Sequence, residues 1–128
     1  MEIKKIHSEK APAAVGPYVQ AKQAGGMLFI SGQLPVEYES GELIIEDISR
    51  AAKASMENIG FILEAAGGNF KDLIKCNIYL VDMSDFAEVN EVYASFFSDG
   101  EYPARACVAV KELPKGARVE IEAIAAIK

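Results

Sequence analysis

One arginine and two glutamates interrupt apolar stretches near the C-terminus. Arg105 lies in PARACVAV (103–110), and Glu120 and Glu122 alternate with apolar residues in VEIEAI (119–124). A guanidinium group matches a carboxylate through two parallel hydrogen bonds, and the small residues around Arg105 leave room for a planar ligand. The alternative is a structural salt bridge from Arg105 to one of the glutamates across adjacent strands. Spacing alone does not decide between carboxylate binding and such a bridge.

Cysteine and histidine, the other common reactive residues, are scarce. Cys76 and Cys107 each lie in an apolar, strand-like run, and the single histidine, His7, is close to the N-terminus. Their spacing does not resemble a metal-ligand set, so we expect no metal site. A Cys–His nucleophilic pair needs a base beside the thiol, which His7 is badly placed to supply. We expect both cysteines to be free and packed.

Length and composition predict one globular domain. The 128 residues are 51% hydrophobic and 25% charged, which is enough apolar material for a core. No apolar run is long enough to cross a bilayer, and the N-terminus lacks the apolar centre of a signal peptide. We therefore expect a cytoplasmic protein without a membrane partner. The net charge of −6 and the scattered basic residues do not favour nucleic acid as a partner.

Hydrophobic periodicity and turn residues predict the order β-β-α-β-α-β-β, with room for one more short strand at the N-terminus. The expected elements are strands over 18–24, 27–36 and 73–81, a helix over 48–66, a second helix from an N-cap at Ser84 to Gly100, and two final strands within 103–124 joined by a turn. This pattern is typical of the α+β class, with one sheet and two helices.

Alternation along the strands predicts two different sheet faces. The apolar face, expected under the helices, comprises Leu28, Ile30, Gly32, Leu34, Ile74, Cys76, Ile78, Leu80, Val108, Val110, Val119, Ile121, Ala123 and Ala125. The mixed face comprises Phe29, Ser31, Gln33, Lys75, Asn77, Tyr79, Arg105, Cys107, Glu120 and Glu122. A mixed face favours burial against another copy of the protein, with polar groups paired or lining a cleft. The alternative is an exposed face that carries some aromatic residues.

Several motifs resemble, in order and spacing, those of the RidA/YjgF family. The stretch PARACVAVKELPKGARVEI (103–121) resembles the family signature, and APAAVGPYVQA (11–21), FISGQLP (29–35), ENIGFILEAAG (57–67) and FAEVNEVYASFF (86–97) agree with it. The resemblance covers nearly the whole chain, as one domain over 1–128. It implies a chorismate-mutase-like α+β fold, with two helices on one face of a single sheet, assembled as a homotrimer with ligand clefts between subunits.

The resemblance also implies an activity and a set of site residues. Such proteins hydrolyse reactive 2-enamine and 2-imino acids, such as 2-aminoacrylate and 2-aminocrotonate, to 2-keto acids and ammonia, without cofactor or metal. Pyridoxal-phosphate enzymes release these intermediates. By position, Arg105 matches the arginine that holds the substrate carboxylate, and Glu120 the glutamate that handles the attacking water. The further substrate-binding positions are Tyr18, Ser31, Gly32, Asn90 and Cys107. Val19 stands where a serine is usual.

These residues have structural interpretations as well. Tyr18 could be a strand aromatic, Ser31 a bulge marker, Asn90 a polar residue at a helix edge and Cys107 a packed small residue. We assign Glu122 a structural pairing role. Two other functions remain open: a binding protein for 2-keto acids or other small carboxylates, which would need Arg105 but not Glu120, and an endoribonuclease, against which stand the acidic balance and the lack of a histidine-based acid–base pair.

Overall fold

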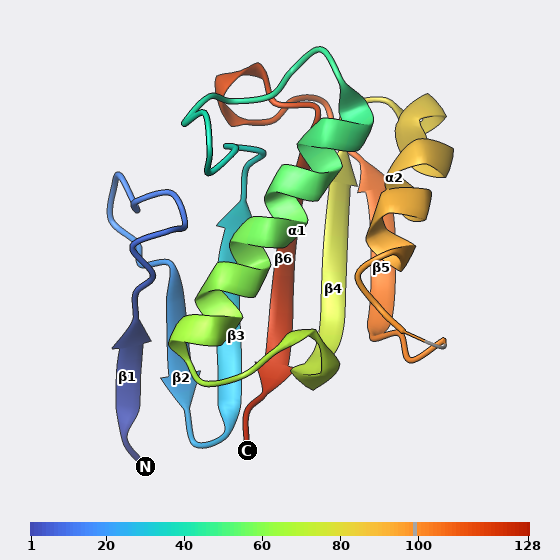
Figure 1. Ribbon diagram of the computed structural model, residues 1–128. Coiled ribbons are helices and arrows are strands. Elements are labelled where there is room, and N and C mark those ends of the chain that lie inside the picture. The colour runs from blue at the N-terminus through green and yellow to red at the C-terminus, as the bar shows by residue number, and fades with distance from the viewer. Residues whose placement is uncertain (99) are drawn as a thin grey trace.

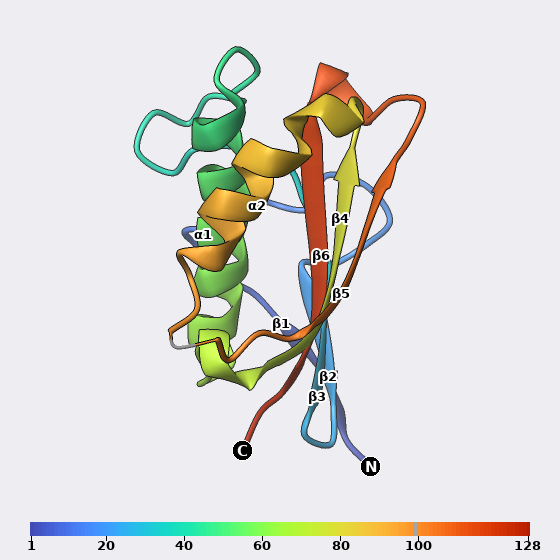
Figure 2. The same ribbon diagram turned by 90° about the vertical axis from the view of Figure 1, so that its right-hand side faces the viewer.

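The computed structural model describes residues 1–98 and 100–128, which form one mixed sheet with two helices on one face (Figures 1 and 2). The sheet order is β1-β2-β3-β6-β4-β5, and only the β4–β5 pair is parallel. The strands are β1 (Ile3–Ile6), β2 (Ala21–Ala24), β3 (Met27–Gln33), β4 (Leu73–Leu80), β5 (Ala104–Ala109) and β6 (Val119–Ala126). The helices are α1 (Ile48–Ala65) and α2 (Phe86–Ala94). The predicted element order is confirmed, and β1 adds a strand at the N-terminus.

Helix α1 agrees with its sequence pattern. The side chain of Asp47 caps its first turn by accepting the backbone N–H of Arg50 at 3.0 Å. The chain leaves the helix through Gly67, whose φ of 83° is a left-handed conformation that suits glycine. The apolar residues that recur along one side of α1 are fully buried against the sheet, among them Met56, Ile59, Ile62 and Leu63. Their facing core residues include Leu28, Ile78, Leu80 and Ile121.

Helix α2 is shorter than predicted, and Ser84 is not its N-cap. Asp82 accepts the N–H of Ser84 at 2.9 Å, which begins a 3₁₀ turn over Met83–Asp85 before α2 starts. Helix α2 then ends at Ala94, not near Gly100. The aromatic rings expected on its last turns lie beyond that end, where Phe96 and Phe97 pack against Phe70 with centroids 5.2 and 6.2 Å away.

Two irregularities shift the predicted alternation. The register of β3 against β6 changes between Ile30 and Gln33, so Gln33 turns into the core with 5% exposed, in place of Gly32. The register of β4 against β6 changes between Leu73 and Lys75. Leu73 is consequently buried, whereas Ile74, predicted for the core, is 45% exposed.

The two C-terminal strands, β5 and β6, are not neighbours, because β4 lies between them. The parallel register pairs Arg105 with Cys76 and Cys107 with Ile78, both partners being core residues. Arg105 and Cys107 therefore face the helices, and Val108 is 46% exposed on the other side. The prediction that Arg105 and Cys107 share the mixed face with Glu120 is wrong. A bridge from Arg105 to Glu120 across adjacent strands is excluded for the same reason.

No helix covers the second face of the sheet, which we call the open face (Figure 2). Its exposed apolar side chains include Phe29 and Val108, with 47% and 46% of their surfaces accessible.

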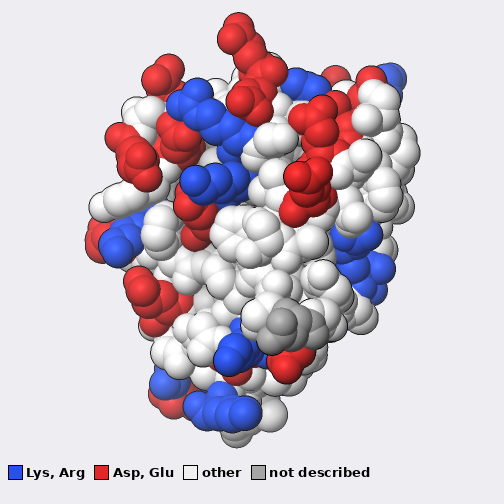
Figure 3. All heavy atoms as spheres, turned by 45° about the vertical axis from the view of Figure 1, so that its right-hand side comes forward, with Lys and Arg blue, Asp and Glu red and all other residues white. Residues whose placement is uncertain are grey.

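On the side of the molecule drawn in Figure 3, Lys and Arg alternate with Asp and Glu, so that side presents no continuous basic surface. Within 1–98 and 100–128, no helix has the length and apolarity that crossing a membrane requires.

Candidate functional site

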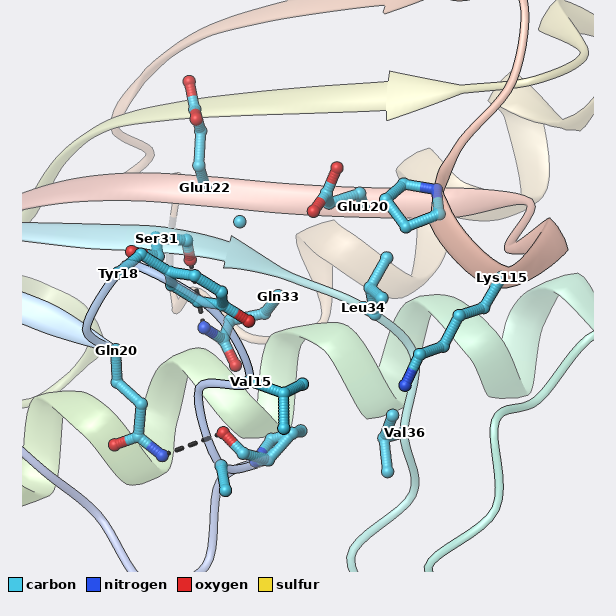
Figure 4. Close-up of a pocket in the computed structure, with 14 residues that line it drawn as sticks. Val15, Tyr18, Gln20, Ser31, Gln33, Leu34, Val36, Lys115, Glu120 and Glu122 are labelled. Carbon is cyan, nitrogen blue, oxygen red and sulfur yellow. Dashed lines mark hydrogen bonds between the residues drawn. The ribbon is translucent and has the colours of Figure 1, made fainter.

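A pocket of about 590 Å³, which we call the Glu120 pocket, lies where β3 and β6 meet the loop over residues 8–20 (Figure 4). Of the predicted site residues, Tyr18, Ser31, Gly32 and Glu120 line it. Glu122 lines it as well, and both glutamates rise from β6 on the same side (Figure 4). The opposite wall is largely apolar, formed by Pro12, Ala13, Val15, Leu34, Val36 and Pro114.

Glu120 and Glu122 have different surroundings. Glu122 accepts hydrogen bonds from Asn77 Nδ2 at 2.9 Å and from the Tyr79 hydroxyl at 2.8 Å, so the pairing role predicted for it is found. The Glu122 carboxylate also raises the pKa of Tyr79, mainly through this hydrogen bond. Burial raises the pKa of Glu120, and the negative charge of Glu122 raises it further. Glu120 is therefore a stronger base than an exposed glutamate.

Gly32 is needed because Glu120 approaches β3 closely. A Cβ atom at this position would lie 2.5 Å from Glu120 Oε2 and 2.8 Å from its Cδ. The β3 irregularity places Gly32 here and leaves the Ser31 hydroxyl to donate to the Val19 carbonyl at 2.6 Å. The interpretation of Ser31 as a bulge marker and its place in the pocket are thus both correct.

Gln20 fixes the loop that carries Tyr18, and sequence reasoning missed it. Its Oε1 accepts the Ser8 N–H at 2.7 Å, and its Nε2 donates to the carbonyls of Ser8, Ala11 and Pro12 at 3.1, 3.3 and 2.9 Å. Gln20 is only 3% exposed, whereas Tyr18 is 52% exposed at the pocket mouth. The partners of Gln20 lie 8 to 12 residues away in an irregular loop, so no periodic signal could have revealed them.

Lys115 is a second residue that the sequence did not indicate. It lines the Glu120 pocket from the short 3₁₀ turn over Pro114–Gly116 that precedes β6 (Figure 4). Among the residues that the structure describes, Lys115 is the one non-glycine residue with a left-handed backbone, at a φ of 60°. The PKG sequence could have suggested a turn here, but not that the lysine would reach a pocket.

A second pocket, of about 410 Å³, lies on the helix side of β5 and contains Arg105 and Asn90; we call it the Arg105 pocket. Arg105 Nη1 donates to Asn90 Oδ1 at 2.6 Å. The guanidinium carbon lies 5.0 Å from the ring centroid of Tyr93 and 5.6 Å from that of Phe86, distances at which a cation is attracted to an aromatic face. Within the described residues, no carboxylate forms an ion pair with Arg105.

Cys107 faces the helices from the same strand as Arg105 but lines neither pocket. Burial raises the pKa of its thiol, and the nearby charge of Arg105 only partly opposes this. The thiol form therefore predominates at neutral pH, which makes Cys107 a poor nucleophile. In the ranges that the structure describes, no group of three His, Cys, Asp or Glu side chains is placed to hold a metal ion.

The chain thus presents two half-sites. The Glu120 pocket offers a base beside an apolar wall, and the Arg105 pocket offers a cation for a carboxylate. These half-sites belong to different faces of one sheet, so a single chain does not bring Arg105 and Glu120 together. Asn90 lies with Arg105, whereas Tyr18, Ser31 and Gly32 lie with Glu120.

Comparison with known proteins gives consistent matches over the whole fold. The chain is 50% identical over 120 residues to a RutC family protein of Pyrococcus horikoshii, covering 94% of each. It is 47% identical over 124 residues to the 2-iminobutanoate/2-iminopropanoate deaminase of Salmonella typhimurium, covering 95% of this chain and 96% of that protein. A mouse protein of the same name is 48% identical over 122 residues, which are 95% of this chain and 90% of that protein.

Solved structures agree with these matches. The crystal structure of Escherichia coli TdcF with bound serine has a TM-score of 0.91 and 45% identity, covering 98% of this chain and 99% of that one. RidA of an Antarctic Psychrobacter has a TM-score of 0.90 and 49% identity, covering 97% and 99%. Residues 8–127 match the family model described as Endoribonuclease L-PSP. With half-sites, fold and relatives in agreement, the chain belongs to this family, which is also known as the RidA/YjgF family.

Proposed function

We propose that this protein hydrolyses reactive 2-enamine and 2-imino acids, such as 2-aminoacrylate and 2-aminocrotonate, to 2-keto acids and ammonia. Relatives covering nearly the whole chain at 47–48% identity are named 2-iminobutanoate/2-iminopropanoate deaminase, which supports this reaction class. The observation on which the proposal rests is the pair of half-sites: an arginine without an ion-pair partner among the described residues in one pocket, and a half-buried glutamate of raised pKa in the other.

The proposed active unit is a homotrimer in which each cleft combines two chains. Arg105 and Glu120 lie on opposite faces of their own sheet, so the Arg105 pocket of one copy would have to meet the Glu120 pocket of a neighbour. The open face supports such an assembly, because its apolar side chains Phe29 and Val108 are 47% and 46% exposed in the isolated chain.

In this cleft the substrate carboxylate would bind the Arg105 guanidinium, whose orientation Asn90 fixes. A protonated imine carbon is already electrophilic, so no covalent intermediate is needed. Water attacks that carbon, the C=N electron pair moves to nitrogen, and Glu120 takes a proton from the water. Glu120 then returns the proton to the nitrogen, the C–N bond breaks as the C–O double bond forms, and the hydroxyl proton passes to the departing ammonia. The products are a 2-keto acid and ammonium.

No cofactor or metal enters these steps, because the iminium already provides the electrophile. Cys107 lines neither half-site, and we give its side chain no chemical role. The apolar wall of the Glu120 pocket, with Val15, Leu34 and Val36, would receive the substrate side chain. We place the protein in the cytoplasm, where the pyridoxal-phosphate enzymes that release such intermediates act.

Two other functions remain as alternatives. A protein that only binds 2-keto acids would need Arg105 but no base. An endoribonuclease is suggested by the description of the family model, yet His7, the single histidine, lines neither pocket. RNA binding would also have to overcome a net charge of −6.

A coupled assay tests the proposed function. A serine or threonine dehydratase generates 2-aminoacrylate or 2-aminocrotonate, and keto-acid release is compared with and without this protein. We expect faster release with the protein, and no acceleration with Glu120→Gln. Equal rates with and without the wild-type protein, together with tight binding of pyruvate, would identify a binding protein instead.

A further inference from the structure

Glu122 lines the Glu120 pocket beside Glu120 without being free to move. Both hydrogen bonds that it receives, from Asn77 Nδ2 and from the Tyr79 hydroxyl, end on the same oxygen, Oε2. The two donors come from β4, the strand that pairs with this part of β6. Two donors to one carboxylate oxygen hold the carboxylate in one orientation. Glu122 therefore presents its carboxylate at a fixed place in the pocket wall.

Strand geometry places Glu122 on the same face as Glu120, because residues i and i+2 of a strand point to the same side and their Cα atoms lie about 7 Å apart. The absence of a side chain at Gly32 leaves room for the Glu120 carboxylate to lie against β3. The two carboxylates thus share one partly buried pocket, in which like charges are screened less than in bulk water.

We propose that Glu122 is a positioning residue whose fixed charge makes Glu120 able both to take a proton from the attacking water and to return it to the departing nitrogen. The inference rests on the proposed deamination and adds a role for Glu122 beyond pairing. A base must hold the proton of the water only until the nitrogen can accept it. A neighbouring negative charge favours the protonated form of this base, Glu120. Consistently, the charge of Glu122 raises the pKa of Glu120 beyond the effect of burial.

Other charged or titratable groups face the pair, and of these only Tyr79 is changed in the experiment below, in a variant of its own. They are Tyr79 and Lys75 from β4, Lys115 from the turn before β6 and Tyr18 from the loop. The neighbouring positions of β3, Ser31 and Gly32, carry no charge. In the proposed assembly Arg105 of a neighbouring copy also approaches, but the substrate carboxylate neutralises it.

Three variants separate charge from packing. Glu122→Gln removes the charge and keeps the shape, Glu122→Asp keeps the charge, and Tyr79→Phe removes one hydrogen bond while the charge stays. In Glu122→Gln we expect the acidic limb of the pH–kcat profile to move to lower pH, because Glu120 loses the neighbouring negative charge that raises its pKa. The plateau turnover should fall about two- to fivefold, because Glu120 becomes a weaker base. KM should change little. Glu122→Asp and Tyr79→Phe should keep the acidic limb of the wild type.

A measurement without substrate supports the kinetics. Carbon NMR of protein labelled at the glutamate carboxyls follows the titration of Glu120, assigned by its loss in Glu120→Gln. Its midpoint should be lower in Glu122→Gln than in the wild type and unchanged in Tyr79→Phe. An unchanged midpoint, or an unchanged acidic limb in an active Glu122→Gln protein of wild-type oligomeric state, overturns this inference alone. A wild type that never accelerates keto-acid release overturns the proposed function, and this inference with it.

Discussion

Arg105 is held by neighbours that orient its guanidinium without neutralising it. Asn90 contributes an uncharged acceptor oxygen at 2.6 Å, and Tyr93 and Phe86 contribute aromatic faces at 5.0 and 5.6 Å. An arginine in a structural salt bridge would instead meet a carboxylate of its own chain, as Arg118 meets Asp85 at 2.8 Å. Of the two interpretations that the sequence left open for Arg105, the structure therefore favours ligand binding.

Arg105→Ala should lose both keto-acid binding and turnover, whereas Glu120→Gln should lose turnover alone. Arg105→Ala removes a bidentate carboxylate contact, so keto-acid binding should weaken by roughly 2–5 kcal/mol and turnover should be lost with it. Glu120→Gln keeps size and hydrogen bonding but loses basicity, so it should still bind a keto acid while turnover falls about 10²-fold or more. Calorimetric titration with pyruvate or 2-ketobutyrate, beside the coupled assay, measures both quantities.

Arg50→Ala is the matched control for the lost positive charge. Arg50 is exposed on α1 and pairs with Glu37 at 2.7 Å, so its loss should change neither binding nor turnover. If Glu120→Gln turns over like the wild type while Arg105→Ala is inactive, Glu120 has only a structural role.

Cys107→Ala should keep most of the activity. Burial raises the pKa of the Cys107 thiol, and the effect of the nearby Arg105 charge is smaller, so the reactive thiolate is scarce near neutral pH. The expected kcat/KM is within about threefold of the wild type, because only packing beside Arg105 changes. Complete loss of turnover in a folded Cys107→Ala protein of unchanged oligomeric state would show that the sulfur participates.

At the scale of elements, local patterns predicted the order of the helices and strands and the bounds of α1, but neither the end of α2 nor which neighbours the strands acquire. Helix α1 follows from its 3.6-residue periodicity, and the structure confirms it to within one residue. The position of β6 between β3 and β4 depends on contacts between distant segments, so the sequence suggested a terminal pair of adjacent strands. That one error placed Arg105 and Cys107 on the wrong face.

The sequence suggested a bulge at Ser31, but it predicted neither the resulting exchange of faces in β3 nor the β4 irregularity. A bulge is set by how two strands fit, and a one-residue shift exchanges the faces, as it does for Gly32 and Gln33. The motif resemblance does not depend on alternation, and four of the residues that it indicated, Tyr18, Ser31, Gly32 and Glu120, line one pocket. It could not indicate Gln20 or Lys115, whose roles arise from loop geometry.

Gly32→Ala tests whether the β3 irregularity positions the base. The added methyl would overlap Glu120 Oε2 and should push the carboxylate out of place, so turnover should fall about tenfold or more. The melting temperature should change little, because the displaced atoms are the end of a flexible side chain. Thermal melts and the coupled assay measure the two effects.

Gly60→Ala is the contrasting control. Its methyl would lie 2.8 Å from the Phe70 ring on the helix side of the sheet, so it should lower stability and leave turnover intact. Full turnover in Gly32→Ala would mean that Glu120 does not need its observed position.

At the scale of the molecule, the uncovered sheet face is the main unexplained feature of an isolated chain. Helices α1 and α2 cover one face (Figure 2), while the open face keeps Phe29 and Val108 nearly half exposed. Burial of apolar surface favours association at about 25 cal/mol per Å². The Glu122 carboxylate also keeps hydrogen bonds to Asn77 and Tyr79 of its own chain when it is buried.

We expect a homotrimer in solution. Sedimentation or light scattering at micromolar concentration should give the mass of three chains, and Val108→Lys should weaken the assembly by placing a charge on the open face. Lys111→Ala changes an exposed residue just beyond β5 and is the control for the assembly measurement. A clean monomer of the wild type under these conditions would contradict both the assembly and the shared cleft.

Subunit mixing tests the origin of each half-site directly. If a cleft takes Arg105 from one chain and Glu120 from its neighbour, trimers that contain both Arg105→Ala and Glu120→Gln chains must include some clefts with both native residues. Random association of equal amounts gives native residues in about a quarter of the clefts, since each half-site is native with a probability of about one half. Co-refolding the two inactive variants should therefore restore about a quarter of the wild-type turnover, whereas each variant refolded alone should stay inactive. A site built within one chain would lack one of the two residues in every copy, so no mixture could recover activity. A mixed trimer that stays inactive would therefore rule out the shared cleft.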